Sequence, residues 1–267
     1  MFDVTAGKLI APEPLILKVE ESVRMLKIDP RNFNQQYEIV NITQEIYQGM
    51  SVFGIHQKTF IMVNQTHEAN QKATGSPTLG FSARNLLLSE HAGTHVDAIW
   101  EMKPEGATID QMQLEYFFGD AICIDMNSVR YPKYIEKEDI QAALNKAGLE
   151  IRQGDIVLLW TGHYDRTYGT PDYTDAGYTG VSYDCAAWLA EQGVVNMGID
   201  APAIDLTPDD LNFSGHQVCM EYETITNSEH YCNLDKVAGK RFLYFGLPLN
   251  IRGGSGSPIR AMALLPK

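Results

Sequence analysis

Hydrophobic and polar positions change their period along the chain. From Tyr37 onward, polar or glycine-containing turns separate short runs rich in β-branched and aromatic residues, such as YEIVNITQEI, KTFIMVNQT and ARNLLLSEH. This pattern is typical of strands. Further on, Ile140, Ala143, Leu144 and Ala147 recur at helical spacing. The pattern therefore predicts several strands followed by an amphipathic helix.

The second half of the chain alternates helical and strand-like runs. After the predicted helix comes GDIVLLWTG, a continuous apolar run typical of a strand covered on both faces. The same order of helix and strand is repeated by SYDCAAWLAEQG and VVNMGIDAP. The chain ends with KRFLYFGLPLNIRGGSGSPIRAMALLP, which predicts two strands joined by a tight glycine-rich turn. This alternation predicts an α/β fold.

Length and composition predict one domain. The 267 residues are 44% apolar, which is enough to fill one large core. Residues 1–35 mix proline, charge and short apolar runs, so we predict an N-terminal extension or arm there and one domain over residues 36–267. The sequence has neither a run of about 18 apolar residues nor the pattern of a secretory signal. We therefore expect no membrane partner and a cytoplasmic location.

The charge of the chain limits the class of partner. The formal net charge is −13, and the sequence pI is about 4.9. Nucleic acids and anionic membranes normally bind clustered basic surfaces, so the charge argues against both. We expect a small-molecule substrate and no nucleic acid.

Four cysteines are too few to form a dense disulfide framework in a chain of this length, and we expect them to be reduced. They are Cys123, Cys185, Cys219 and Cys232. A structural zinc site is an alternative, because His216-x-x-Cys219 is followed by His230-x-Cys232. That spacing lacks the paired Cys-x-x-Cys units that identify such sites.

Three residues of metal-ligand type lie within seven positions of one segment. They are His91, His95 and Asp97, in the run SEHAGTHVDAIWE. If this run is extended, side chains alternate between its two sides, so the three converge across Gly93. A helix would instead turn Asp97 away by about half a turn. The segment therefore predicts an extended metal-binding tripod.

Two imidazoles and one carboxylate suit Zn²⁺, Mn²⁺ or Fe²⁺. With an open coordination position, such a metal lowers the pKa of bound water toward neutrality, and hydrolysis is the natural use. One alternative is that the histidines are ordinary polar residues near a turn. Another is an iron-dependent oxygenase, but in those enzymes the second histidine typically lies far along the chain.

The segment resembles the cyclase-like metal hydrolases, which include bacterial kynurenine formamidase, isatin hydrolase and trans-dienelactone hydrolase. The family pattern is His-x-Gly-Thr-His-x-Asp-x-Pro-x-His. This chain matches it at His91, Gly93, Thr94, His95 and Asp97. It has Ile99 in place of the proline and Glu101 in place of the last histidine. The resemblance implies that Glu101 takes over the proton transfer or metal binding of that histidine, or that the chemistry is altered.

The resemblance extends from about Tyr37 to the C-terminus, through blocks such as WTGHYD, MGIDAPAID and LPLNIRGGSGSPIRA. It implies that His216 and Glu229 complete the metal centre, as a second-metal pair where two metals bind. Without the resemblance, both are equally compatible with ordinary polar roles. Glu221 or Glu223 replaces Glu229 if the alignment is shifted by a few residues.

Other polar and aromatic residues give weaker signals. Asp200 and Asp205 follow a buried strand at its carboxyl end, where α/β sites commonly lie, although we expect capping or turn roles. The turn RGGSGSP precedes a β-prone run instead of a helix, so it fails the context test for a phosphate-binding loop. We also expect four residues to line a substrate pocket, with packing as the alternative for each. They are Phe53, Trp100, His163 and Tyr164.

Together, these observations predict a metal-dependent hydrolase. By resemblance, the fold is a single α/β domain with a mixed β-sheet core and flanking helices of the swivelling β/β/α type. The cofactor is a divalent metal, Zn²⁺ or Mn²⁺, one or two per subunit, and the protein is a homodimer or higher homo-oligomer. The substrate is a small cyclic amide, imide or lactone, or an aryl formamide, with Glu101 as proton shuttle. The alternatives are a metal-containing protein that only binds a small molecule, and a metal-dependent lyase or isomerase.

Overall fold

The computed structural model describes residues 33–208 and 213–267. The chain divides into two compact units, Met1–Gln36 and Tyr37–Lys267. Residues 1–32, most of the predicted N-terminal extension, lie outside the described residues. The short helix α1 (Phe33–Gln36) belongs to the first unit, and all other described elements belong to the second.

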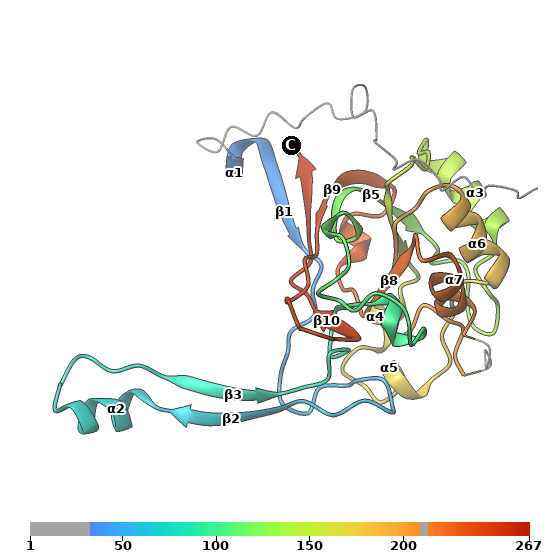
Figure 1. Cartoon of the computed structure of the whole chain (residues 1–267). Coiled ribbons are helices and arrows are strands. Elements are labelled where there is room, and N and C mark those ends of the chain that lie inside the picture. The colour runs from blue at the N-terminus through green and yellow to red at the C-terminus, as the bar shows by residue number, and fades with distance from the viewer. Residues whose placement is uncertain (1–32, 209–212) are drawn as a thin grey trace, which may run out of the picture. The chain divides into compact units, whose positions relative to one another are not determined.

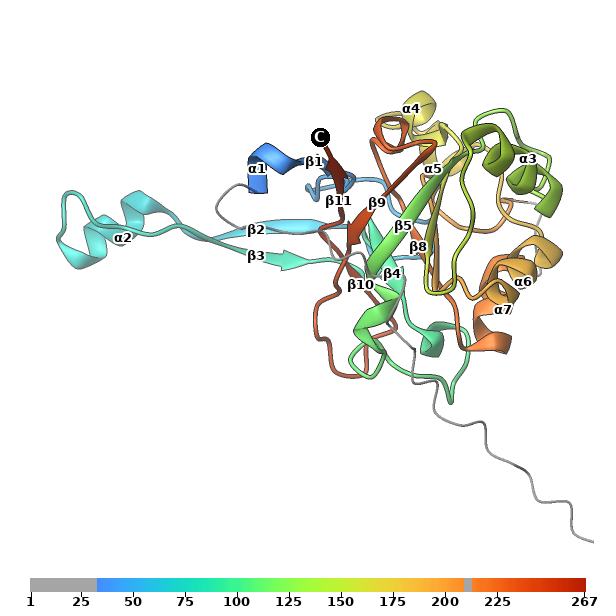
Figure 2. The same cartoon turned by 90° about the horizontal axis from the view of Figure 1, so that it is seen from above.

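A nine-stranded mixed sheet forms the centre of the second unit (Figures 1 and 2). Strands β5 to β8 run parallel to their neighbours in the centre, and every other pairing is antiparallel. The strands in spatial order are β1 (Tyr37–Asn41), β11 (Met262–Pro266), β9 (Lys240–Phe245), β5 (Phe118–Asp125), β6 (Ile156–Trp160), β7 (Asn196–Ile199), β8 (Thr226–Glu229), β4 (His95–Asp97) and β10 (Gly256–Pro258). The predicted α/β fold with a mixed sheet is confirmed.

Both faces of the parallel centre are buried, as the continuous apolar run predicted. In β6, Val157 and Leu159 join one hydrophobic cluster, whereas Ile156 and Leu158 join a second cluster. This follows from the alternation of side chains along a strand. The first cluster includes side chains of the larger helices, and the second includes those of β9, β11 and β1.

Three helices pack near one another beside the central strands: α3 (Lys137–Ala147), α6 (Tyr183–Glu191) and α7 (Ser214–Tyr222). The predicted helix is α3, whose apolar face buries Ile140 and Leu144. A capping box between Glu136 and Asp139 begins it, and Gly148, with φ of 65°, ends it. The remaining short helices are α4 (His163–Thr167), α5 (Asp172–Asp175), η1 (Ile99–Glu101), η2 (Leu114–Tyr116) and η3 (Leu234–Lys236).

Two of the predicted strands form a separate ribbon instead of joining the main sheet. Strands β2 (Phe60–Gln65) and β3 (Ala83–Leu87) pair with each other, and α2 (His67–Thr74) lies between them in sequence. Residues 60–87, called the ribbon below, project away from the nine-stranded sheet in both views (Figures 1 and 2). β3 ends shortly before the histidine-rich segment, so the ribbon leads directly into the candidate site.

Among the described residues, no helix has the length and apolar character needed to cross a membrane.

Candidate metal centre

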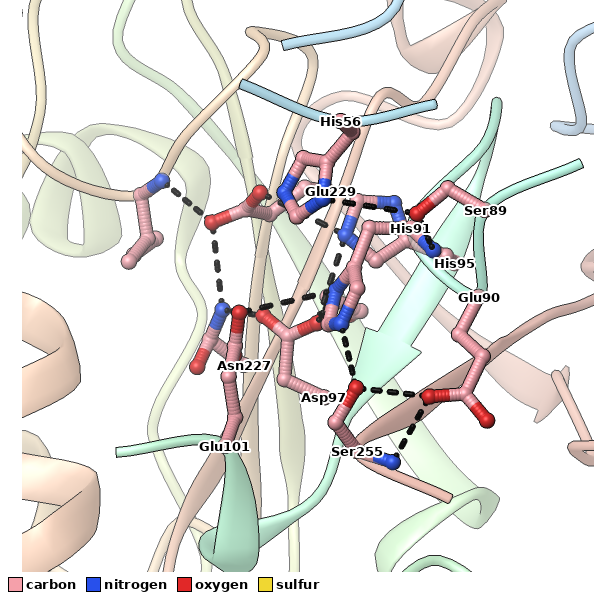
Figure 3. A network of polar contacts seen from close by, with 12 residues as sticks. His56, Ser89, Glu90, His91, His95, Asp97, Glu101, Asn227, Glu229 and Ser255 are labelled. Atoms are coloured by element: carbon pink, nitrogen blue, oxygen red, sulfur yellow. Dashed lines mark hydrogen bonds and ion pairs between the residues drawn. The ribbon is translucent and has the colours of Figure 1, made fainter. Parts of the chain in front are cut away.

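The histidine-rich segment is extended only from His95 to Asp97, where it forms β4. The prediction that the whole segment is extended was therefore wrong. Gly93 has φ of 66°, in the left-handed region that favours glycine, so the chain turns between His91 and His95. The Thr94 hydroxyl donates to the His230 carbonyl at 2.6 Å and holds this turn against the strand end. The turn still brings the three side chains together (Figure 3).

His91 is held on both sides of its ring. Its Nδ1 lies 2.7 Å from Asp97 Oδ1, and its Nε2 lies 2.9 Å from the Ser255 hydroxyl. Ser255 is fixed in turn by Glu90, which accepts from its backbone N–H and its hydroxyl. The neighbouring Gly256 is needed for space, because a Cβ there would lie 2.8 Å from His91 Cε1.

The glycine-rich segment is more than the tight turn that we predicted. Residues 256–258 form β10, which pairs with β4 in the register Gly256↔Asp97 and Pro258↔His95. Three strands, β9, β10 and β11, therefore replace the predicted pair. The glycines allow this segment to pass close to the candidate ligands.

His95 presents its Nε2 atom to two carboxylates. Its Nδ1 lies 2.8 Å from the Gly93 carbonyl, which can only accept a hydrogen bond, so Nδ1 carries the proton. The free Nε2 lies 3.3 Å from Asp97 Oδ1 and 3.6 Å from Glu229 Oε2. β4 pairs with β8 in the register His95↔Glu229, and this pairing brings the distant glutamate to the site.

His216 faces the same carboxylates from α7. Its Nδ1 lies 2.5 Å from Asp205 Oδ2, while its Nε2 lies 3.4 Å from Asp97 Oδ2 and 3.6 Å from Glu229 Oε1. Asp205 also accepts from the Gly215 N–H at 2.7 Å. A carboxylate that orients a histidine in this way is typical of metal sites. Asp205 therefore acts through His216, in addition to any role in its turn.

Asn227 and Glu229 project from the same face of β8 into the site (Figure 3). The Asn227 amide donates to Asp97 Oδ2 and, at 3.1 Å, to Glu229 Oε1. Glu229 Oε1 also accepts from the Ile204 N–H at 2.8 Å. The sequence analysis missed Asn227, although its position two residues before Glu229 was a usable signal.

Glu101 lies at the end of η1, with Oε1 3.6 Å from His91 Nδ1 and Oε2 3.8 Å from His216 Nε2. Its Oε2 is buried and has no hydrogen-bond partner in the part of the chain that the structure describes. Burial and the nearby charge of Asp97 raise the pKa of Glu101 to about 7. The carboxylate therefore has an unused acceptor atom inside the site.

Burial and neighbouring charges also shift the pKa values of two carboxylates and two histidines of the site. Burial would raise the pKa of Asp97, but the neighbouring His95 and His91 outweigh it and hold that pKa well below its usual range. Burial and the charge of Asp97 raise the pKa of Glu229. For His91, burial opposes protonation, yet Asp97 raises its pKa to about 9. Asp205 outweighs burial in the same way and raises the pKa of His216.

This donor set fits a divalent metal ion. Among the residues that the structure describes, three overlapping groups have ligand atoms within 4.8 Å of one another: His91, His95 and Asp97; Asp97, Glu101 and His216; and His56, His91 and Glu101. Three carboxylates, those of Asp97, Glu101 and Glu229, share a buried space in which negative charges disfavour one another. A cation would relieve this repulsion and also use the partnerless Oε2 of Glu101.

A cavity of about 230 Å³ opens onto these side chains. His91, His95, Glu101, His216 and Glu229 line it on the polar side. Its other walls include Phe53, Ile55, His56, Met102, Pro202, Ala203 and Phe213. Of the four predicted pocket residues, the structure places only Phe53 in this cavity.

The other three predicted pocket residues lie elsewhere. Trp100 is 41% exposed on η1. His163 is buried, with Nε2 2.8 Å from the Tyr173 carbonyl, and it lines a different cavity. Tyr164 stacks on Tyr168, with ring centroids 4.4 Å apart.

The structure also separates the alternatives that the sequence left open. Glu221 accepts from the Tyr183 hydroxyl and Glu223 pairs with Lys103, so these two carboxylates have other partners. The sequence analysis missed His56, which stacks on His91 with centroids 4.8 Å apart. No local motif marks His56, because it reaches the site from the loop between β1 and β2.

All four cysteines are free and buried.

Comparison with known proteins decides the family. The Cyclase family model matches residues 40–206. A kynurenine formamidase from Paracidovorax citrulli (strain AAC00-1) is 30% identical over 73% of this chain and 85% of its own length. The chain belongs to the Cyclase family. Another kynurenine formamidase, from Salinibacter ruber (strain DSM 13855 / M31), is 33% identical to this Cyclase-family protein over 67% of the chain and 77% of its own length.

Solved structures share the fold of this Cyclase-family protein. An isatin hydrolase bound to the product analogue thioisatinate has a TM-score of 0.77 and 21% identity, covering 89% of this chain and 96% of its own. Isatin hydrolase A from Ralstonia solanacearum has a TM-score of 0.74 and 23% identity, covering 86% and 92%. The predicted membership of the cyclase-like metal-dependent hydrolases is confirmed, and the protein is an enzyme of the hydrolase class.

Proposed function

We propose that this enzyme hydrolyses a small cyclic amide, imide or lactone, or an aryl formamide. The observation that carries the proposal is a cluster of metal-ligand side chains around Asp97 that opens onto one cavity of about 230 Å³. The members that line the cavity are His91, His95, Glu101, His216 and Glu229. The names of the relatives, kynurenine formamidase and isatin hydrolase, support an aryl formamide or a cyclic amide as the substrate.

His91, His95 and Asp97 would hold the metal, Zn²⁺ or Mn²⁺, with His216 and Glu229 completing a site for one or two ions. Asp97 has one oxygen facing His91 and His95 and the other facing His216, so its carboxylate can serve two positions. A bound metal lowers the pKa of water and polarises a carbonyl group. Asp205 fixes the ring of His216, and the Gly93 carbonyl fixes the ring of His95. The Nε2 atoms of both histidines would then face the bound ion.

Glu101 is the proposed proton shuttle. Its buried Oε2 has no hydrogen-bond partner among the described residues, so it can accept the proton that the attacking water loses. It would then return that proton to the leaving nitrogen or oxygen, so the same carboxyl acts first as a base and then as an acid. Burial raises the pKa of this carboxyl, and the charge of a bound cation would lower it again, which favours the ionised form that accepts a proton.

The apolar walls of the cavity fit a flat ring. Phe53, Ile55, Met102 and Phe213 are the larger apolar residues that line it beside the polar cluster. His56 also lines the cavity, stacked on His91, and could contact a substrate bound there. A small aromatic or conjugated acyl compound meets both the apolar walls and the polar centre.

We also propose a homodimer or higher homo-oligomer. The ribbon carries large apolar side chains that are more than half exposed, among them Val63, Phe81 and Leu86. Two-stranded ribbons are marginally stable alone in water. A second copy of the chain would cover these side chains.

Metal content and turnover test the proposal together. Elemental mass spectrometry on untagged protein purified without added metal should find about one or two equivalents of zinc or manganese, as the donor sets imply. The His95→Ala variant should lose this metal, whereas Glu101→Gln should keep it. The metal-loaded parent should open rings or release formate in a panel of lactones, cyclic amides, imides and aryl formamides. Metal without turnover would leave a ligand-binding protein, and deuterium exchange into unhydrolysed substrate would indicate a lyase or isomerase.

A further inference from the structure

A second cavity, separate from the metal centre, lies at the carboxyl ends of the neighbouring parallel strands β5 and β6. It has a volume of about 220 Å³. Arg130, from the loop after β5, and Arg166, from α4 after β6, both line it. Tyr178 also lines it, and the backbone of Tyr178 pairs with Thr207, a residue of the metal-site cavity. The paired segments that contain Tyr178 and Thr207 therefore line both cavities.

The two arginines bind the same acceptor atoms. Arg130 Nη1 donates to the Thr161 carbonyl at 2.8 Å, and Arg166 Nη1 donates to it at 3.0 Å. The Asn127 side-chain oxygen accepts from Arg130 Nη2 at 2.6 Å and from Arg166 Nη1 at 3.2 Å. These shared acceptors fix two guanidinium groups side by side, and they occupy only some of the five N–H donors that each group has.

Two adjacent positive charges repel each other, and an anion between them offsets that repulsion. Within the described ranges, no carboxylate comes within 4 Å of either guanidinium, whereas Arg241 pairs with Asp155 and Arg152 pairs with Glu150. Partial burial and the charge of Arg130 lower the pKa of Arg166. The nearby acids have other donors: Asp165 accepts from Trp160 Nε1, and Asp200 accepts from Thr161. The arrangement thus holds two cations together without an acidic partner, in a chain of net charge −13.

We propose that this cavity is a binding site for a small oxyanion, a carboxylate or phosphate group held between Arg130 and Arg166. Guanidinium groups present paired N–H donors that match the oxygens of both anions. The anion would also screen the repulsion between the two arginines. Tyr178 and Thr207 pair between this cavity and the metal-site cavity, so the anion would be a second ligand bound beside the reaction centre. Its binding would not depend on the metal.

Anion titration of the full-length protein tests the site directly. Thermal unfolding would be followed against inorganic phosphate and, separately, against benzoate, with chloride keeping the ionic strength constant. The unfolding temperature should rise and saturate with one of these probes, and the probe with the lower midpoint identifies the phosphate or the carboxylate class. Chelator-treated and metal-loaded protein should respond alike, because the proposed site contains no metal.

Variants separate this site from general ionic effects. Arg166→Gln and Arg130→Gln should each raise the midpoint of the titration about tenfold or more, since each removes charge-assisted hydrogen bonds. Arg166→Lys should lie between parent and glutamine, because it keeps the charge but loses the paired donors. Arg152→Gln, at an exposed ion pair, is the matched control and should leave the midpoint unchanged. No saturable response in the parent, or the same midpoint in every variant, overturns the proposal.

Discussion

Two histidines of the metal centre are oriented by an acceptor at Nδ1. The Gly93 carbonyl serves His95 and the Asp205 carboxylate serves His216, so both Nε2 atoms face Asp97 and Glu229. These acceptors hold both rings through contacts within the protein, which lowers the entropic cost of forming a metal site. Asp205 is therefore a positioning residue for His216, and under the proposed function it would act on the metal through that histidine.

Asp205→Asn should weaken metal binding without abolishing it. The amide cannot supply the charge that orients the His216 ring, and losses of this kind typically cost about 10- to 100-fold in metal affinity. Competition against a chromophoric chelator measures the change. Asp120→Asn, at an exposed position on β5, is the control. Equal affinities of Asp205→Asn and the parent would show that the Asp205 charge does not support metal binding through His216.

Glu101→Gln should keep the metal but lose turnover. The amide has nearly the same shape, yet it cannot accept a proton, and general acid–base catalysis typically contributes about 10²- to 10⁴-fold. The measurement compares kcat with metal content by elemental mass spectrometry, once a substrate from the panel is in hand. Loss of metal in this variant would instead assign Glu101 as a ligand.

At the residue scale, local spacing and the family resemblance each predicted part of the site, and two residues from distant elements were missed. His91, His95 and Asp97 lie within seven positions, so spacing alone could reveal them. Asn227 and His56 arrive from other elements, and their positions depend on strand pairing and loop course that no local pattern encodes. The family resemblance indicated His216 and Glu229, which strand register then brings near Asp97.

At the level of elements, the pairing of β4 with β8 and β10 assembles the site. β8 supplies Asn227 and Glu229, while β10 follows Ser255, which contacts His91. The segments 178–181 and 204–207 make a further pairing, in which the Val181 N–H donates to the Ile204 carbonyl at 2.9 Å. This pairing positions Asp205, and so it supports His216 from a distance.

Gly180→Ala should disrupt this pairing. A Cβ at residue 180 would lie 2.1 Å from the Asp205 carbonyl carbon and 2.4 Å from the Ile204 oxygen, both of which are backbone atoms. The segments must move apart, and overpacking of this kind typically costs about 1–3 kcal/mol. Denaturant unfolding should show that loss, together with weaker metal binding. Gly54→Ala, where a Cβ meets no atom within 4 Å, should behave like the parent, and equal stability of the two variants would contradict this account.

The sequence predicted element types better than the partners of each element. The spacing of apolar residues and the capping residues predict helix α3, and a continuous apolar run predicts strand β6. These signals are local in the sequence. KTFIMVNQT and ARNLLLSEH did form strands, β2 and β3, but their sheet could not be foreseen. Both faces of these runs carry apolar residues, so the spacing of apolar positions does not predict whether the strands join the main sheet or form a separate one.

At the scale of the whole molecule, the ribbon exposes several large apolar side chains within the part of the chain that the structure describes. In the register Ile61↔Leu86 and Val63↔Arg84, the side chains of Ile61, Val63 and Leu86 share one face. Val63 is 68% exposed and Leu86 is 59% exposed. Contiguous exposed apolar surface of this kind commonly marks an interaction site.

The double variant Val63→Thr/Leu86→Thr should therefore shift the protein toward the monomer. Threonine is β-branched and favours strands at both positions, so the ribbon should still form while its contact with a second copy weakens. Sedimentation velocity at several concentrations measures the mass, and circular dichroism with metal analysis checks that fold and metal centre are intact. Leu114→Thr, at a position 61% exposed outside the ribbon, controls for the general loss of apolar surface. If the parent sediments as a monomer, or if the double variant keeps the parent's oligomeric mass, the ribbon is not the surface that joins the copies.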